Sequence, residues 1–373
     1  MDPQEQFCHN EGCRAYGRKA EGHIVIHSSA ERRYQCKRCK YTFSETKGTA
    51  LYRIHKPKEL VLTVVTLLAY GCPLQAICAA FGLDERTVAR WEREAGMHCR
   101  RVHEHVVEAG RVELGQVQAD ELRVRVIGGV MWLAGALAVE SRLWLGGVVS
   151  LRRDRDLIRA LLSRVRACGV VRAVLLCTDG LASYPKAAIH LFREPLRTGG
   201  VGRPRLILPE GVMIAQVIKR YAKRRVVGVI RHVVVGAGEA VAARLRATQG
   251  GSETAVINTA YIERLQATFR SRLAGLVRRS RAPLRLRETL AAGMWLVGTC
   301  YNFCWEHKSM RREREGSDPP GEKWVQSTPA QAAGLTNHRW SVEELLSFPV
   351  PPAERPKWRG RRPRWLVEAA RAA

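Results

Sequence analysis

The chain has 373 residues, too many for one small core, so two or three domains are expected. It contains 62 lysines and arginines against 35 aspartates and glutamates, a net charge of +27, which predicts binding to a polyanion such as nucleic acid. No apolar run of about 18 residues occurs, and the opening MDPQEQ lacks the pattern of an export signal, so we expect neither a secreted nor a membrane protein. The eleven cysteines are therefore expected as thiols or metal ligands.

Four cysteines are grouped near the N-terminus in two close pairs, CHNEGC and CKRC. Each pair falls on a short turn, and the segment between them has the pattern of two short strands. Four thiolates brought together by two hairpin tips suit tetrahedral Zn²⁺, and such a closed site is structural. Residues 1–50 are therefore predicted to form a zinc ribbon, with four free thiols as the alternative and His9 as an alternative ligand. The predicted ligands are Cys8, Cys13, Cys36 and Cys39.

Residues 57–96 contain three segments with apolar residues at helical spacing, the last two separated by a glycine-containing turn. Asp84 is a good N-cap for the last helix, which is expected to begin at Glu85 and end at Ala95. This pattern predicts a DNA-binding helix-turn-helix within residues 51–110, and an ordinary three-helix packing unit is the alternative. The buried stripe is expected to be Val88, Trp91 and Ala95, and the arginines expected to face DNA are Arg86, Arg90 and Arg93.

After residue 110, β-type patterns come first and helical patterns follow. Three strand-like runs, separated by glycines and a charged turn, predict an antiparallel meander. An amphipathic helix is expected at 154–169, and a nearly continuous apolar run at 170–180 is typical of a central strand covered on both faces. Three antiparallel strands, a helix and a buried fourth strand predict a ribonuclease-H-like α/β domain. The three strand-like runs are 117–126, 128–140 and 142–150.

The rest of the chain departs from this pattern and then returns to it. Residues 193–256 hold a Gly/Pro/Arg loop and a basic run, and are expected to form an insertion with β-strands of its own. The α/β domain resumes with helices at about 258–280 and 285–305, so that it covers residues 111–310. Residues 311–373 are polar, proline-rich and basic, which predicts a largely irregular C-terminal tail.

Three acidic residues lie where they could hold metal ions. Asp120 is mid-strand on the side that should face a helix, Asp179 ends the buried strand, and Glu263 lies on the late helix. Such carboxylates are the ligands that two Mg²⁺ (or Mn²⁺) ions, about 3.5–4 Å apart, need for in-line attack on a phosphodiester. Each residue also has an ordinary explanation as a turn or surface charge, and Glu239 or Glu253 could replace Glu263.

In their order along the chain, these motifs resemble those of a bacterial insertion-sequence transposase of the DDE class, the type with an N-terminal zinc ribbon and helix-turn-helix. The matching stretches are CHNEGC…YQCKRCKYTF, AICAAFGLDERTVARWE, VQADEL, LLCTDGLASYPKA, YIERLQATFRSRLAGLVRRS and YNFCWEHKSM. The resemblance implies metal-dependent DNA strand cleavage and strand transfer at the ends of an insertion sequence. It also implies that Asp120 and Asp179 are the first two catalytic aspartates and that Glu263 is the third acid.

The resemblance further implies double-stranded DNA as the partner, a homodimer or larger assembly that pairs two element ends, and a cytoplasmic, nucleoid-associated location. Arginines that follow Glu263, among them Arg270, Arg278 and Arg279, are expected to contact phosphates. Two alternatives stay open, namely a non-catalytic DNA-binding regulator derived from a transposase and another ribonuclease-H-like nuclease. A zinc hydrolase is disfavoured because the chain contains no HExxH motif.

Overall fold

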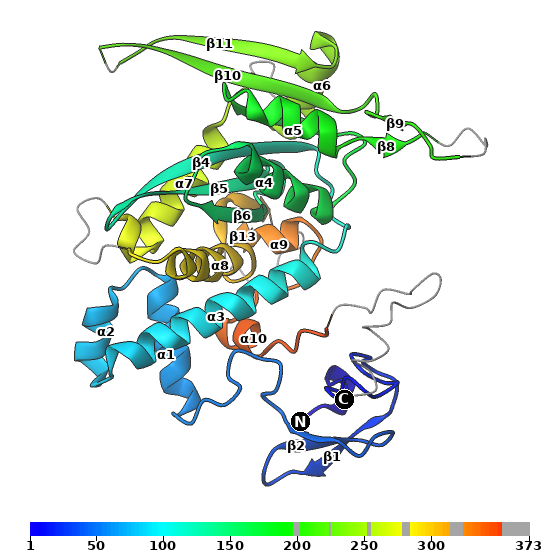
Figure 1. Ribbon diagram of the computed structural model, residues 1–373, viewed down its shortest axis with the longest axis vertical. Helices are drawn as coiled ribbons and strands as arrows, with labels where there is room; N and C mark the ends of the chain where they lie inside the picture. Colours follow the sequence, from blue (N-terminus) through cyan, green and yellow to red (C-terminus); the bar gives the residue numbers. More distant parts are fainter. Residues whose placement is uncertain (197–201, 224, 252–254, 278–283, 314–323, 353–373) are drawn as a thin grey trace. The chain divides into compact units, whose positions relative to one another are not determined.

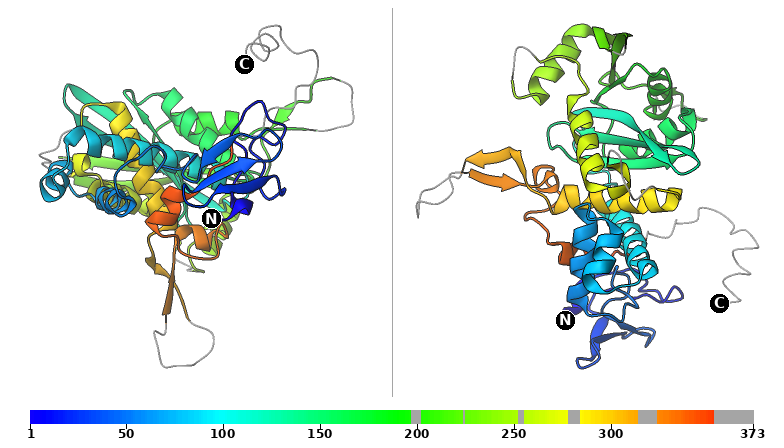
Figure 2. Two further views of the ribbon diagram at one scale, coloured as in Figure 1. Left: turned by 90° about the horizontal axis from the view of Figure 1, so that it is seen from below. Right: turned by 90° about the vertical axis from the view of Figure 1, so that its left-hand side faces the viewer.

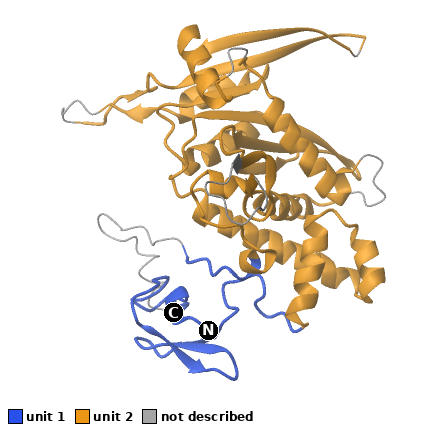
Figure 3. Ribbon diagram, turned by 180° about the vertical axis from the view of Figure 1, so that it is seen from behind, with its two compact units in different colours: residues 1–55, 346–373 blue, residues 56–345 orange. Residues whose placement is uncertain are grey.

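The computed structural model describes residues 1–196, 202–223, 225–251, 255–277, 284–313 and 324–352 (Figure 1). The chain divides into two compact units, one formed by residues 1–55 with 346–373 and the other by residues 56–345 (Figure 3). The three helices that follow residue 56 therefore belong to the same unit as the large β-sheet. Across the described residues, no helix combines the length and the apolar character needed to cross a membrane.

The first unit contains a small antiparallel sheet. After a 3-10 turn at Pro3–Glu5, its strands in order are β1 (Ile24–Ser28), β2 (Arg33–Cys36) and β3 (Thr42–Ser44). β1 and β2 are the two strands expected between the cysteine pairs. Tyr34 and Phe43 stack with their ring centroids 5.9 Å apart in a core that also contains Cys8 and Cys36. So small a core gives little hydrophobic stabilisation by itself.

Three helices follow residue 56, and a tight turn joins the last two. They are α1 (Lys58–Ala69), α2 (Leu74–Phe81) and α3 (Glu85–Val106). α2 ends at Gly82, whose φ of 62° lies in the left-handed region that favours glycine. The Asp84 carboxylate accepts a hydrogen bond from the backbone N–H of Arg86 at 2.8 Å and so caps α3. The start of α3 is where the sequence predicts it.

α3 is longer than the sequence analysis predicts. It continues beyond the expected end at Ala95 and packs along α8 (Arg287–Phe303). The two helices approach closely at Gly96, where a Cβ atom would lie only 2.3 Å from the backbone oxygen of Ala292. Gly96, the residue after the expected helix end, therefore permits close helix packing in the fold. The predicted stripe of Val88, Trp91 and Ala95 is buried.

The second unit is built on a six-stranded sheet with the order β11-β10-β7-β4-β5-β6. β4, β5 and β6 are antiparallel neighbours, which confirms the predicted meander. β7 runs parallel to β4, β10 runs parallel to β7, and β11 returns antiparallel to β10. The strands are β4 (Gln116–Val126), β5 (Gly129–Ala138), β6 (Trp144–Ser150), β7 (Leu175–Asp179), β10 (Met213–Ala222) and β11 (Arg225–Val235).

Helices cover both faces of this sheet (Figures 1 and 2). One face carries α4 (Arg155–Cys168) and α5 (Ser183–Leu191), and the other carries α6 (Gly238–Thr248), α7 (Ala260–Arg272) and α8. Trp144 of β6 is fully buried, with ring centroids 5.7 Å from Phe269 of α7 and 5.1 Å from Trp295 of α8. Such aromatic pairs contribute about 0.5–1.5 kcal/mol each beyond the area they bury, so they help to fix α7 and α8 on the sheet.

Two elements differ from the sequence analysis. The predicted insertion at 193–256 contains β10, which is a strand of the main sheet beside β7. Outside that sheet this stretch shows β8 (Glu194–Pro195), β9 (Leu206–Ile207) and α6 in the part that is described. The helix expected at 258–280 ends at Arg272 and is followed by a 3-10 turn at Ala274–Leu276. Leu273 has an extended backbone, which explains the early end of the helix.

After α8, residues 324–347 form short elements where the sequence analysis predicts a largely irregular tail. The elements beyond α8 are β12 (His307–Glu313), β13 (Trp324–Ser327), α9 (Pro329–Ala332) and α10 (Val342–Ser347). Trp340 is buried against Phe303 of α8, with 4.6 Å between ring centroids, and this packing explains the local order. The basic stretch RPKWRGRRPRW lies outside the described residues.

A cavity of about 590 Å³ lies among α1, α2, α3 and α8. Its wall is largely apolar and includes Leu68, Leu273 and Leu290. Glu92 of α3 also faces this cavity, and burial raises the pKa of its carboxyl group to about 7. The ionised form of Glu92 is therefore disfavoured in the folded state.

Replacing Glu92 by glutamine should stabilise the protein near pH 8 and leave its stability unchanged near pH 4. The unfolded carboxyl loses its proton near pH 4.5 and the folded one near pH 7, so wild-type stability falls as the pH rises between these values. The variant should then gain about 3 kcal/mol above pH 7, measured by urea unfolding. Glu94→Gln, at a partly exposed position of the same helix that does not line the cavity, is the control. An equal gain at both pH values for Glu92→Gln would contradict the assigned pKa.

Candidate functional site

Asp120 and Asp179 meet because their strands are parallel neighbours. β4 and β7 pair with Ala119 opposite Thr178, so the next residue of each strand is an aspartate, and the two lie side by side. Together with Glu121 they form a group in which one carboxylate oxygen of each residue lies within 4.8 Å of the others. Clustered carboxylate oxygens are the ligands that hard divalent cations prefer, so this group could hold a metal ion.

Arg153, in the segment between β6 and α4, joins two of these acids. Its Nη2 atom donates to Oε2 of Glu121 and to Oδ2 of Asp179, each at 2.8 Å. The Glu121 side chain is fully buried, whereas about a third of the Asp179 and Arg153 side chains is exposed. Asp179 also accepts a hydrogen bond from the backbone N–H of Leu181 at 3.0 Å, which orients its carboxylate. The ion pair thus links the buried acid to the open cleft.

Glu263 lines the same cleft, which has a volume of about 430 Å³ and is also lined by Asp120 and Asp179. It lies in the first turn of α7, where its Oε1 accepts hydrogen bonds from Lys219 Nζ at 2.6 Å and from the Thr259 hydroxyl at 2.8 Å. Among the described residues, the close carboxylate group contains Glu121 and not Glu263. The structure therefore brings all three predicted acids to one cleft, with Glu263 set apart beside a lysine of β10.

The acids of the cleft differ in their affinity for protons. Burial raises the pKa of Asp120 to about 6, and the nearby carboxylates of Asp179 and Glu121 add to this effect. The pKa of Glu263 is lowered although burial opposes the shift, because Lys219 donates a hydrogen bond to its carboxylate and carries a positive charge. A cation held between the two aspartates would offset the repulsion at Asp120. The acidic group could therefore hold a metal ion.

Sequence reasoning missed three residues of the cleft, Glu121, Arg153 and Lys219. Glu121 follows Asp120, and the alternation of side chains along a strand places it on the opposite face, toward Arg153. It joins the group because Arg153 holds its carboxylate beside that of Asp179. Nothing in the sequence distinguishes Arg153 or Lys219 from neighbouring basic residues, since their partners come from other strands and from α7.

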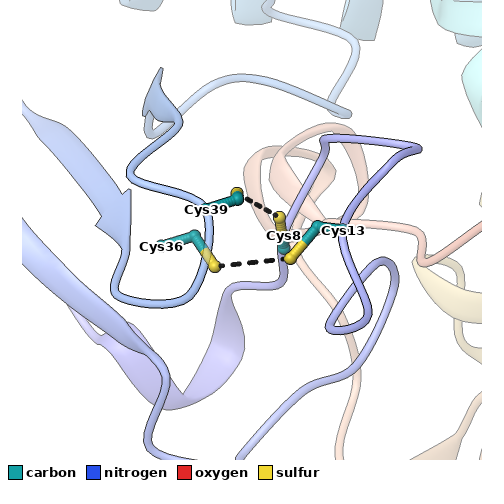
Figure 4. A group of neighbouring side chains, drawn as sticks. All are labelled: Cys8, Cys13, Cys36 and Cys39. Carbon is teal, nitrogen blue, oxygen red and sulfur yellow. Dashed lines mark hydrogen bonds between the residues drawn. The ribbon is translucent and has the colours of Figure 1, made fainter. Parts of the chain in front are cut away.

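In the first unit, the four predicted zinc ligands come together (Figure 4). The Sγ atoms of Cys8 and Cys39 are 3.6 Å apart, and those of Cys13 and Cys36 are 4.0 Å apart. A tetrahedral site with metal–sulfur bonds of about 2.3 Å has sulfur–sulfur edges of about 3.8 Å. The observed separations fit this geometry, so the four cysteines could hold one metal ion.

The surroundings of these thiols shift their pKa values in different directions. Although burial opposes the shift, hydrogen bonds from the backbone at Tyr41 and from Cys8 and Cys13 lower the pKa of Cys39 to about 7. Burial raises the pKa of Cys8. A metal ion would favour the thiolate form of all four ligands. His9, the alternative ligand, contributes no atom to the cluster.

The arginines predicted to contact DNA are exposed wherever the structure describes them. They are Arg86, Arg90 and Arg93 on α3 and Arg270 on α7. Arg90 lies 3.8 Å from Glu94 in an exposed pair, which holds it weakly and leaves it available to a phosphate. Arg278 and Arg279 lie outside the described residues. Contact of these side chains with DNA stays a prediction.

The chain matches no model of a known protein family and no curated protein. The features that bear on function are the two clusters of side chains. One is a cleft with carboxylates and cations, and the other is a closed group of four thiols. The first could act on a phosphate ester, whereas the second is suited to a structural metal ion.

Proposed function

We propose that this protein is a DNA transposase of the DDE class that cleaves and joins DNA strands at the ends of a bacterial insertion sequence. One observation carries the proposal, namely that Asp120 of β4, Asp179 at the end of β7 and Glu263 of α7 line a single cleft. The strand order supports it, because a ribonuclease-H-like domain is expected to have three antiparallel strands followed by strands parallel to the first.

The three acids suit two Mg²⁺ or Mn²⁺ ions. Asp120 and Asp179 would be ligands of the same metal ion, and Glu263, which lines the same cleft, would provide a further carboxylate ligand. The ions would activate the attacking water or 3′-hydroxyl and offset charge on the phosphodiester. The four cysteines of the first unit would hold one structural Zn²⁺ ion, because their sulfur separations match tetrahedral thiolate ligation.

The cationic side chains of the cleft would position the phosphodiester. Arg153 and Lys219 line the cleft from the β6–α4 segment and from β10, so that a phosphate entering the cleft would meet positive charges from two elements. Arginine binds phosphate through two parallel N–H donors, and lysine binds it as a point charge. The partners of these cations are Asp179 and Glu263, which are also two of the residues that would hold the metal ions.

Double-stranded DNA, from the element ends and the target, is the proposed partner. The net charge of +27 favours binding along the phosphate backbone, and the exposed arginines at the start of α3 suit the major groove. Two element ends must be paired for transposition, so we propose a homodimer or larger assembly on DNA. The corresponding location is the bacterial nucleoid.

Incubating the wild-type protein with labelled duplexes taken from the flanks of its own gene should give strand cleavage and strand joining. Both reactions should require Mg²⁺ or Mn²⁺ and should stop when a chelator is added. Gel separation of the labelled products measures both. Cleavage without joining would favour another ribonuclease-H-like nuclease.

Binding without cleavage under either metal would favour a DNA-binding regulator. The ion pairs that already neutralise Asp179 and Glu263 would then be permanent features of the cleft. A protein that neither binds nor cuts the flanking DNA would refute the proposal.

A further inference from the structure

The outer half of the β10–β11 hairpin is exposed although it is regular β-structure (Figure 1). Within the part of the chain that the structure describes, β10 pairs with β7 from Met213 to Val217, and beyond this point it pairs with β11 alone. Ile218 is 37% exposed and Tyr221 is 63% exposed. β11 is an edge strand whose side chains are mostly exposed. Exposed apolar side chains on a hairpin of this length indicate a binding surface.

One face of this hairpin continues the wall of the carboxylate cleft. Val217, Lys219 and Tyr221 alternate along β10, and all three line the cleft together with Ile218. Lys219 is paired with Val229 on β11 and Tyr221 with Val226, with a register shift between the two pairs. Going outward from the acids along β10, the Lys219 cation therefore comes first and the Tyr221 ring second.

The hairpin is also strongly basic. Residues 213–235 contain no aspartate or glutamate. Lys219 is paired with Glu263, and the Arg231 guanidinium donates to the backbone oxygen of Ile257. The side chains of three further basic residues are exposed and make no hydrogen bond or ion pair with any other residue that the structure describes. They are Arg220, Lys223 and Arg225.

We propose that the outer β10–β11 hairpin binds the DNA strand that enters or leaves the cleft, with Tyr221 stacked on an unpaired base next to the reacting phosphate. Stacking on an exposed aromatic ring suits any base, and free cations nearby suit the adjoining phosphates. A second copy of this chain fits the surface less well, because it would bring two strongly basic hairpins together. The inference rests on the proposed function in so far as the substrate is DNA.

Replacing Tyr221 by alanine in the full-length protein should weaken binding to DNA with unpaired bases. The probe is a fluorescein-labelled duplex of mixed sequence with a short single-stranded extension, and the same duplex with blunt ends is the comparison. Loss of one stacked base should raise Kd for the extended probe by roughly 5- to 150-fold, measured by fluorescence anisotropy. Tyr221→Phe keeps the ring and should bind like the wild type. Kd for the blunt-ended duplex should differ much less between Tyr221→Ala and the wild type.

A second variant tests the cations. Arg220→Ala, Lys223→Ala and Arg225→Ala combined should lower the slope of log Kd against log salt by about 2–3, since each lost phosphate contact removes about 0.7–0.9. Arg172→Ala removes one exposed charge before the amino end of β7, away from the cleft, and should leave Kd for the extended probe unchanged. All the substituted side chains are exposed, so thermal unfolding should show intact folds.

The outcomes separate this inference from the proposed function. A wild type that binds neither probe would refute the DNA function itself. A wild type that binds the extended probe equally well with Tyr221→Ala and with the triple variant would refute the hairpin's role alone. Unchanged DNA binding together with a changed sedimentation coefficient for the variants would identify the hairpin as a self-association surface and would likewise overturn the inference.

Discussion

Replacing Asp120 or Asp179 by asparagine should abolish metal-dependent strand cleavage while DNA binding persists. Each aspartate offers carboxylate oxygens to the close group of the cleft, and an amide cannot offset a divalent charge in the same way. Loss of a metal ligand should reduce the cleavage rate by at least about 10³-fold, or about 4 kcal/mol of transition-state stabilisation. The cleavage rate of each variant is measured as an initial rate on labelled flanking duplexes, and DNA binding is measured separately.

Glu263→Gln and Glu121→Gln distinguish two assignments of the third acid. If Glu263 acts as proposed, its substitution should be as damaging as those of the aspartates. Glu121→Gln should lose less than about tenfold, because the Glu121 side chain is fully buried and held by Arg153. The reverse order of effects would assign the third acid to Glu121 and refute the role proposed for Glu263.

Asp156→Asn is the matched control for these substitutions. Asp156 is exposed in the first turn of α4 and does not line the cleft, so its substitution removes the same charge from a site outside the cleft. It should cleave like the wild type. Because burial already raises the pKa of Asp120, Asp120→Asn should not destabilise the fold, and thermal unfolding checks this. Full cleavage by Asp120→Asn or Asp179→Asn would rule out the cleft as the active site.

Local sequence patterns were sufficient to predict much of the sheet and the positions of the two aspartates in it. The alternating runs gave β4, β5 and β6, and a continuous apolar run gave β7 with Asp179 at its end. Asp120 could be singled out because a charge in phase with buried residues of a strand is costly unless it has a partner. In the same way, two close cysteine pairs were enough to predict the four-thiol cluster. All of these signals lie within a few residues of the side chains concerned.

Features that depend on distant pairing could not be predicted. β10 looks like part of an insertion because its buried half is recognisable only through its parallel partner β7. α3 looks shorter because the contact that Gly96 permits is with Ala292, far along the chain. Arg153 and Lys219 resemble any other basic residue until the fold places them beside Glu121 and Glu263. Long-range register, and not local propensity, therefore decides which charges face the cleft.

Removing the zinc ion proposed for the four-cysteine cluster should unfold the first unit while the second stays folded. The core around Tyr34 and Phe43 is small, and a structural Zn²⁺ ion typically contributes about 10–16 kcal/mol of apparent binding free energy, comparable with the whole stability of a domain. A zinc chelator, or Cys36→Ser, should therefore increase amide hydrogen exchange across β1, β2 and β3. Exchange in β4 and β7 should not change, since these strands have their own core.

Cys78→Ser provides the control, because Cys78 is a partly exposed thiol of α2 outside the cluster. Exchange in the first unit should be unaffected by this change, and elemental analysis should still find one zinc ion per chain. In Cys36→Ser the zinc content should fall in parallel with protection of the small sheet, because binding and folding are one process. Lowering the pH should have the same effect as the chelator, since protons compete with the metal for the thiolates. Purified wild type that lacks a metal and keeps a fully protected β1–β3 sheet would exclude a structural metal ion.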